Sequence, residues 1–334
     1  MFFKKTLGLA LAMMALTAPI YSYSNDCCDD CYDPCCTSGF TVYGDWLYWS
    51  PRKCTLDYAL PYDGSNAIGK VHSVCPSYDN GYRIGLSKTC DCWTYGINYT
   101  HYHSDERSSV TDATNGDLAG TRIIDNYTVL SQGSIQFAKA KWDLDYDVIS
   151  LYAGYNTTFN CVDTVIFGGF KFAFIDQKLD TLYTATLSPG SQDAIYQKNC
   201  LDAYGLTIGL TPSYNLCGCL NAFGTFSYDI LAGNFDRTFD YRTSTNGGTT
   251  VLERARLKES CWNLLSVFNL SFGLRYDWMT CDKNFFLALG YEFHHWVNGF
   301  GFLEHQNESG EITLDRYHDS LGFDGLFLRA GVSF

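Results

Sequence analysis

The sequence predicts an all-β protein, an antiparallel up-and-down transmembrane β-barrel of about ten strands, with twelve as the alternative count. Three observations predict this fold. Apolar and polar residues alternate with period two along many segments, which is the pattern of strands. Beyond the N-terminus, no stretch reaches the roughly 18 consecutive apolar residues that a spanning helix needs. Long and short connections between the segments also alternate strictly, as in barrels with short periplasmic turns and long external loops.

The first element, residues 1–24, has the features of a secretory signal peptide. Lys4 and Lys5 precede an apolar run that ends near Ala18, and small residues around Ser24 offer a cleavage point. We expect residues 25–39 to be a cysteine-rich periplasmic segment and residues 40–334 to be the barrel. The predicted location is therefore the bacterial outer membrane. The formal charge, 23 − 36 = −13, argues against sequence-independent binding of nucleic acid.

Ten segments then carry the strand pattern. The clearest is the last, in which Leu326, Leu328 and Ala330 share one face with Val332 and Phe334. An even number of strands returns both chain ends to the periplasmic side, as bacterial barrels require. The segments lie at about 40–49, 80–88, 93–103, 141–156, 161–175, 201–214, 220–232, 262–277, 285–297 and 324–334.

The two phases of this alternation predict a lipid-facing side and a lumen side. A Lys or Arg facing lipid near the midplane costs roughly 2–4 kcal/mol, so we assign the charged residues to the lumen. The predicted pore-lining residues are Asp45, Arg83, Asp143, Asp145, Asp147, Lys171, Asp229, Arg275, Glu292 and Arg329. Aromatic residues near strand ends are predicted to form interfacial girdles. These are Trp46, Trp142, Tyr146, Trp262, Tyr276 and Trp278.

Cysteines are abundant, 15 in all, and an exported chain meets an oxidising compartment. Eleven are predicted on the periplasmic side: Cys27, Cys28, Cys31, Cys35, Cys36, Cys90, Cys92, Cys161, Cys217, Cys219 and Cys281. The others are assigned outside: Cys54 and Cys75 in the first long loop, and Cys200 and Cys261 at loop ends. Disulfides within the barrel, disulfides to other chains and metal binding all remain open. Cys54–Cys75 is the simplest external pair, and metal binding is disfavoured because zinc needs reduced thiolates.

Catalytic signatures are missing from the sequence, which contains no G-x-S-x-G, HExxH or glycine-rich phosphate loop. His101 and His103 share one strand face, as do Glu292 and His294, but neither pair completes a metal-site pattern. We therefore expect a protein that is not an enzyme and that carries no cofactor or metal.

Seven short segments are distributed over nearly the whole mature chain: FTVYGDWLYWSP, KWDLDYDVISLYAGY, FGGFKFAFID, LDAYGLTIGL, FGLRYDW, LALGYEFHHW and GLFLRAGVSF. In their order and spacing they resemble the MOMP-like (major outer-membrane protein-like) pore-forming family of chlamydiae and Legionella. The resemblance implies a porin for passive diffusion of small hydrophilic solutes or ions. The cysteine load resembles the chlamydial side of the family, whose envelopes are stiffened by disulfides.

Two functional hypotheses follow. The first is the disulfide-stabilised porin, and the alternative is a structural envelope protein or surface adhesin without significant conductance. The closing Phe334, with Val332 before it, resembles the signal that hands barrels to the assembly machinery. The expected partners are therefore that machinery, outer-membrane lipid, and disulfide-linked envelope proteins or further copies of this chain.

Overall fold

The computed structural model describes residues 39–62, 69–111, 118–123, 135–185, 191–245, 250–280, 283–308, 311–316 and 319–334. The predicted signal peptide, the cysteine cluster between Cys27 and Cys36, and Cys281 lie outside these residues. Among the described residues, no helix has the length and apolar character needed to cross a membrane.

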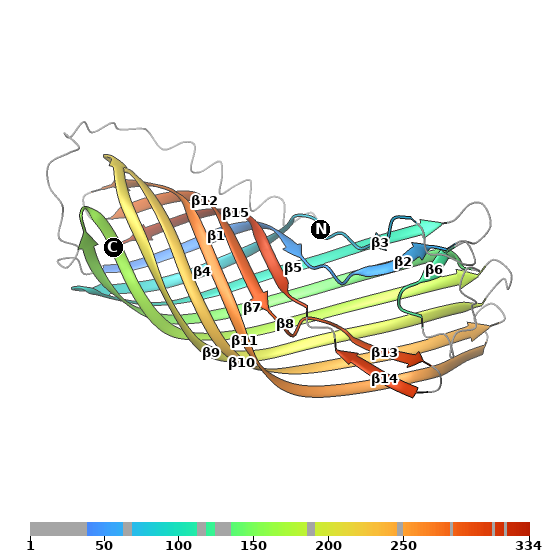
Figure 1. The fold of residues 1–334 in the computed structure, drawn as a ribbon. Helices are drawn as coiled ribbons and strands as arrows, with labels where there is room; N and C mark the ends of the chain where they lie inside the picture. The colour runs from blue at the N-terminus through green and yellow to red at the C-terminus, as the bar shows by residue number, and fades with distance from the viewer. Residues whose placement is uncertain are drawn as a thin grey trace.

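Ten long strands pair antiparallel in a closed ring, which confirms the predicted fold class and strand count (Figure 1). In ring order from β1, each strand pairs with the next through β15, β12, β11, β10, β9, β8, β7, β5 and β4. The backbone groups of Phe40 and Phe334 exchange hydrogen bonds where the first and last strands close the barrel. The strands are β1 (Gly39–Arg52), β4 (Asp79–Cys90), β5 (Trp93–Thr111), β7 (Ile135–Phe159), β8 (Val162–Ala185), β9 (Gln192–Cys217), β10 (Leu220–Thr245), β11 (Thr250–Met279), β12 (Asn284–Val297) and β15 (Leu321–Ser333).

Tight turns join the strands at one end of the barrel, which is the predicted periplasmic end and is called so below. Asn160 and Cys161 connect β7 to β8 with φ values of 46° and 65°. Positive φ at both positions is the geometry of turns that match strand twist, and Asn adopts it readily. Each tight turn fixes the register of its hairpin, and so decides which residues face inward.

Short strands lie at the opposite end, which is the predicted external end, and do not enlarge the ring of ten, so the alternative count of twelve is wrong. β2 (Asp57–Pro61) pairs with β3 (His72–Ser73) and with β6 (Leu118–Gly120), which joins the edge of β7. A separate hairpin consists of β13 (Leu303–Glu308) and β14 (Glu311–Arg316).

The wall of the barrel is much taller on one side than on the other. Strands β8 to β11 have 24, 26, 26 and 30 residues, whereas β1 and β12 have 14 each. A tilted strand crosses a bilayer in about 9–11 residues. The long strands therefore exceed the length that one membrane crossing requires, and in Figure 1 they extend toward β13 and β14.

Alternate residues in the membrane zone separate a lipid-facing side from an inner side. Leu206, Ile208 and Leu270 point outward and are 60%, 63% and 47% exposed. Inside, aromatic rings lie over glycines of the neighbouring strand: a Cβ added to Gly85 would lie 2.2 Å from Cζ of Tyr43. Other inward-facing rings pack in the same way over glycines of adjacent strands, where they fill the space that a side chain would otherwise take.

Candidate functional site

Charged side chains from four adjacent strands meet inside the barrel. Asp45 on β1 lies opposite Arg83 on β4 and opposite Arg329 on β15 in the strand register. Arg83 Nη1 donates to Asp45 Oδ2 at 2.9 Å, and Arg329 Nε donates to Asp45 Oδ1 at 2.7 Å. Arg83 Nη2 also donates to Glu292 on β12, at 3.1 Å. Asp45 thus accepts hydrogen bonds from two guanidinium groups. One of these, the guanidinium of Arg83, also donates to Glu292.

The polar contacts continue from β12 around the wall to β8. Nε2 of His294 lies 3.5 Å from Glu292, and its Nδ1 lies 2.7 Å from Oδ1 of Asn269 on β11. Asn269 Nδ2 donates to Asp229 on β10 at 2.8 Å. Asp229 also accepts hydrogen bonds from Lys171 and from Thr207. A connected chain of polar groups, called the charge chain below, therefore runs from Arg329 to Lys171.

The acids of the charge chain are buried, and its charges balance. The side chains of Asp45 and Asp229 are 0% exposed, and that of Glu292 is 4% exposed. Three acids, Asp45, Asp229 and Glu292, face three bases, Arg83, Arg329 and Lys171. Buried ions are tolerated only when they are paired and hydrogen-bonded, which this arrangement achieves.

An aromatic layer lies directly on the external side of the charge chain. Trp49 Nε1 donates to Glu292 at 3.0 Å, and so joins the two layers. The rings of Tyr146 and Phe323 lie 4.8 Å apart, and Tyr146 also contacts Trp49 and Trp296. These residues come from β1, β7, β12 and β15, and each is at most 4% exposed. Tyr146 on β7 and Trp296 on β12 lie on opposite sides of the ring, so the aromatic layer spans the lumen at this level.

Residues 298–303 form a strap that folds into the barrel above the aromatic layer. Phe300 and Phe302 are 1% and 2% exposed. Side chains on the wall hold the strap by its carbonyl oxygens: Arg237 and Asn199 donate to Gly299 at 2.9 and 3.1 Å. Gly299 has a φ of 94°, and an added Cβ would lie 2.4 Å from the Phe235 ring, so only glycine fits here.

A buried lysine beyond the end of β1 fastens the strap from the other side. Lys53 Nζ donates to the carbonyl oxygen of Phe300 at 2.5 Å and to Asp319 at 2.9 Å. Its side chain is 0% exposed, and burial lowers its pKa to about 8, although Asp319 partly offsets the shift. The strap is therefore held by side chains from β9, β10 and the β1 terminus.

The sequence of residues 32–334 matches the family model described as Legionella pneumophila major outer membrane protein precursor. The chain belongs to this family. Its barrel therefore resides in the bacterial outer membrane, which confirms the predicted location and the predicted resemblance. No curated protein matches the chain.

Three solved outer-membrane proteins are similar to this chain at very low sequence identity. The outer membrane protease OmpT from Escherichia coli is 9% identical, with 89% of this chain and 96% of that chain covered and a TM-score of 0.44. The translocator domain of the autotransporter NalP from Neisseria meningitidis is 10% identical, with coverages of 89% and 88% and a TM-score of 0.31. A FadL homologue from Pseudomonas aeruginosa is 8% identical, with coverages of 90% and 92% and a TM-score of 0.27.

Seven of the ten predicted pore-lining residues of this outer-membrane protein lie on the inner wall. Six of them form the ionic part of the charge chain. The seventh, Arg275, lies nearer the periplasmic end, where it donates to Asp277 and its guanidinium carbon lies 4.0 Å from the centroid of the Phe286 ring. The role of all seven in lining a pore remains a prediction.

The assignment of Asp143, Asp145 and Asp147 to the lumen is wrong. They lie on the outer wall of β7, where Asp145 and Asp147 pair with His103 and His101 of β5. Their neighbours Trp142 and Tyr146, assigned to the girdles, are buried inside instead. The alternation is present but its sense is reversed, because this part of β7 extends beyond the membrane. There the outer wall faces water and the interior holds the aromatic layer. Trp46, Trp262 and Tyr276 do point outward, at 47%, 61% and 45% exposure.

The described cysteines fall into two states. Cys92 and Cys161, in neighbouring periplasmic turns, are disulfide-bonded. Seven others are free thiols: Cys54, Cys75, Cys90, Cys200, Cys217, Cys219 and Cys261. The simplest external pair, Cys54 with Cys75, is not bonded, and both thiols are exposed and free. Within the described ranges, no group of three metal-ligating side chains is suitably placed to hold a metal ion.

Sequence patterns do not identify the strap, Lys53, Trp49 or Asn269 as parts of this site. The glycines and phenylalanines of Gly299–Phe302 are the only local signal, since two phenylalanines are unusual in a loop predicted to face water. The other three residues gain their roles from contacts across the lumen.

Proposed function

We propose that the protein is a gated outer-membrane channel for passive diffusion of small hydrophilic solutes or ions, and that this conformation is its closed state. The observation that supports the proposal is the charge chain at the level of the membrane. A permanently sealed interior is generally more stable when it is built from apolar side chains than from buried ion pairs. Paired charges, by contrast, can exchange partners and admit water.

The charge chain also supplies the expected selectivity. Arg83 on β4 and Glu292 on β12 are separated by β1 and β15 in the ring, so these opposite charges meet over the lumen rather than along one strand pair. When the pairs separate, such side chains set a field across the path and discriminate among ions. The barrel of ten strands gives a narrow path, because eight strands leave room only for side chains and wide channels need 16 or more.

Ion selectivity in planar bilayers tests this proposal on the refolded full chain. Arg275→Glu changes an inward charge near the periplasmic mouth and should shift selectivity toward cations. Arg107→Glu is the matched control, because Arg107 lies on the outer wall with its side chain 61% exposed. An equal shift in both variants, or in neither, would contradict a conducting lumen lined by these residues.

The second candidate is a structural envelope protein or surface adhesin that does not conduct. The aromatic layer and the strap favour it, because together they fill the external half of the lumen with packed side chains. Heat-modifiable migration of the folded barrel on gels, combined with no conductance under any voltage, would support this candidate over the channel.

We also propose that disulfides at the periplasmic rim stabilise the barrel and link it to other envelope proteins or to further copies of this chain. Cys217 and Cys219 are exposed free thiols in the β9–β10 turn, so they are accessible to another chain. Removing both by Cys217→Ser and Cys219→Ser should reduce high-mass species on non-reducing gels, while Cys54→Ser should not. A monomeric wild-type band under both reducing and non-reducing conditions would refute cross-linking.

A further inference from the structure

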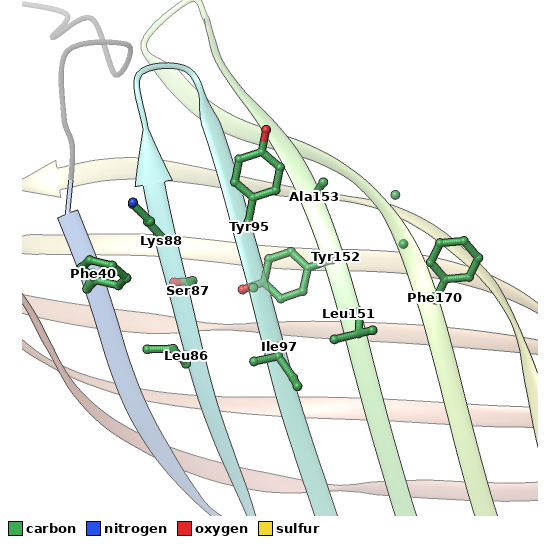
Figure 2. A pocket seen from close by; sticks show the side chains of 13 residues that line it. Phe40, Leu86, Ser87, Lys88, Tyr95, Ile97, Leu151, Tyr152, Ala153 and Phe170 are labelled. Atoms are coloured by element: carbon green, nitrogen blue, oxygen red, sulfur yellow. The ribbon is translucent and has the colours of Figure 1, made fainter.

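A groove of about 480 Å³ lies on the lipid-facing wall, near the periplasmic ends of β1, β4, β5, β7 and β8 (Figure 2). This size falls within the roughly 300–1,000 Å³ that is typical of small-molecule sites. Apolar side chains that point outward line it, chiefly Leu86, Ile97, Leu151 and Phe170. The groove is separate from the lumen and from every residue of the charge chain.

The groove arises because one row of side chains across the wall changes from large to small. Phe40 pairs with Lys88, Lys88 with Tyr95, Tyr95 with Ala153, and Ala153 with Gly168. The large residues stand at one end of this row, whereas Ala153 and Gly168 leave a hollow at the other. An added Cβ at Gly168 would find its nearest neighbour, the backbone oxygen of Thr207, 3.7 Å away, so a side chain fits here with ordinary van der Waals contact.

Two polar groups, the ammonium of Lys88 and the hydroxyl of Tyr95, lie at one end of the groove. Lys88 is exposed, lies three residues before the β4–β5 turn and has its Nζ 5.1 Å from the centroid of the Phe40 ring. Within the described part of the chain, Lys88 has no carboxylate partner. Tyr95 is 51% exposed, and Figure 2 shows its hydroxyl and the Lys88 ammonium at the same, turn-proximal end. The apolar lining continues from these two groups toward the middle of the membrane.

This layout matches the shape and charge of a phospholipid in the periplasmic leaflet. A cation and a phenol at headgroup level suit a phosphodiester, and an apolar trough beneath them suits an acyl chain. We propose that the groove binds one glycerophospholipid of the periplasmic leaflet, with its phosphate at Lys88 and an acyl chain over Ala153 and Gly168.

Native mass spectrometry of the folded full chain, released from micelles doped with phosphatidylglycerol, tests the site. Wild type should retain one lipid. Lys88→Gln should weaken retention roughly fivefold, the worth of one surface ammonium near anionic headgroups. Diacylglycerol, which has the acyl chains but no phosphate, should be retained weakly and should not respond to Lys88→Gln.

Filling the groove provides the independent variant. Gly168→Leu should abolish retention without harming the fold, because the position faces lipid and has room for a side chain. Gly224→Leu is the matched control, since its nearest atom to an added Cβ lies 3.5 Å away on β11, far from the groove. Equal retention in all variants would overturn the proposal, because it would indicate nonspecific annular lipid. Dimers of wild type that Gly168→Leu dissociates would also overturn it, because they would make a second copy the occupant.

Discussion

Replacing Asp229 by Asn should destabilise the barrel strongly, although the two side chains have nearly the same shape. Asp229 is 0% exposed and receives hydrogen bonds from Lys171, Thr207 and Asn269. The amide cannot neutralise Lys171, whose side chain is only 11% exposed. Removing one partner of a buried ion pair typically costs about 3–5 kcal/mol, so we expect a loss in that range.

Equilibrium unfolding in guanidinium, followed by tryptophan fluorescence of the full chain in detergent micelles, measures this loss. The double variant Lys171→Met with Asp229→Asn should recover most of the stability, because it removes the stranded charge together with its partner. Asp145→Asn is the matched control: its side chain is 46% exposed, so its effect should stay below about 0.5 kcal/mol. A double variant as unstable as Asp229→Asn alone would refute a coupled pair.

Three further predictions concern the strap, the topology and the packing of the lumen. Burial lowers the pKa of Lys53 from 10.5 in the unfolded chain to about 8 in the folded protein. Between these two pH values the unfolded chain binds more protons than the folded protein, so the free energy of unfolding should rise with pH. Lys53→Met should flatten this part of the pH profile, and an unchanged slope would contradict the assignment. A membrane-impermeant maleimide on intact cells should label Cys54 but not Cys217, and the reverse pattern would invert the topology. Gly85→Ala should cost about 1–3 kcal/mol in unfolding free energy by overpacking against Tyr43, whereas Gly44→Ala, whose nearest atom is 4.0 Å away, should be neutral.

The ring of ten strands was predictable because a strand between lipid and lumen must alternate in polarity. That alternation, together with the lengths of the connections, also places Asp45, Arg83 and Arg329 inside. The same rule fails for Asp143 to Asp147, where β7 has left the membrane and the polar face turns outward. Strand length beyond the bilayer is set by packing of the external half, which period-two alternation does not report.

The contacts that close the lumen were not predictable from local pattern. Lys53 and Phe300 are 247 residues apart in the sequence, and Trp49 and Glu292 are 243 apart. Such pairs are fixed only when the ring closes and opposite walls meet. A single sequence therefore indicates which residues face inward, but not which of them join across the interior.

We propose above all that the lumen conducts when the ion pairs of the charge chain separate and the strap moves out of the barrel. Single-channel recording of wild type and of the double variant Asn199→Ala with Arg237→Ala tests this claim most directly, since the variant frees the carbonyl of Gly299. We predict brief, small openings in wild type and a several-fold longer open time in the variant. If neither protein conducts at any voltage while both remain folded, heat-modifiable barrels, the channel account is contradicted and the structural role takes its place.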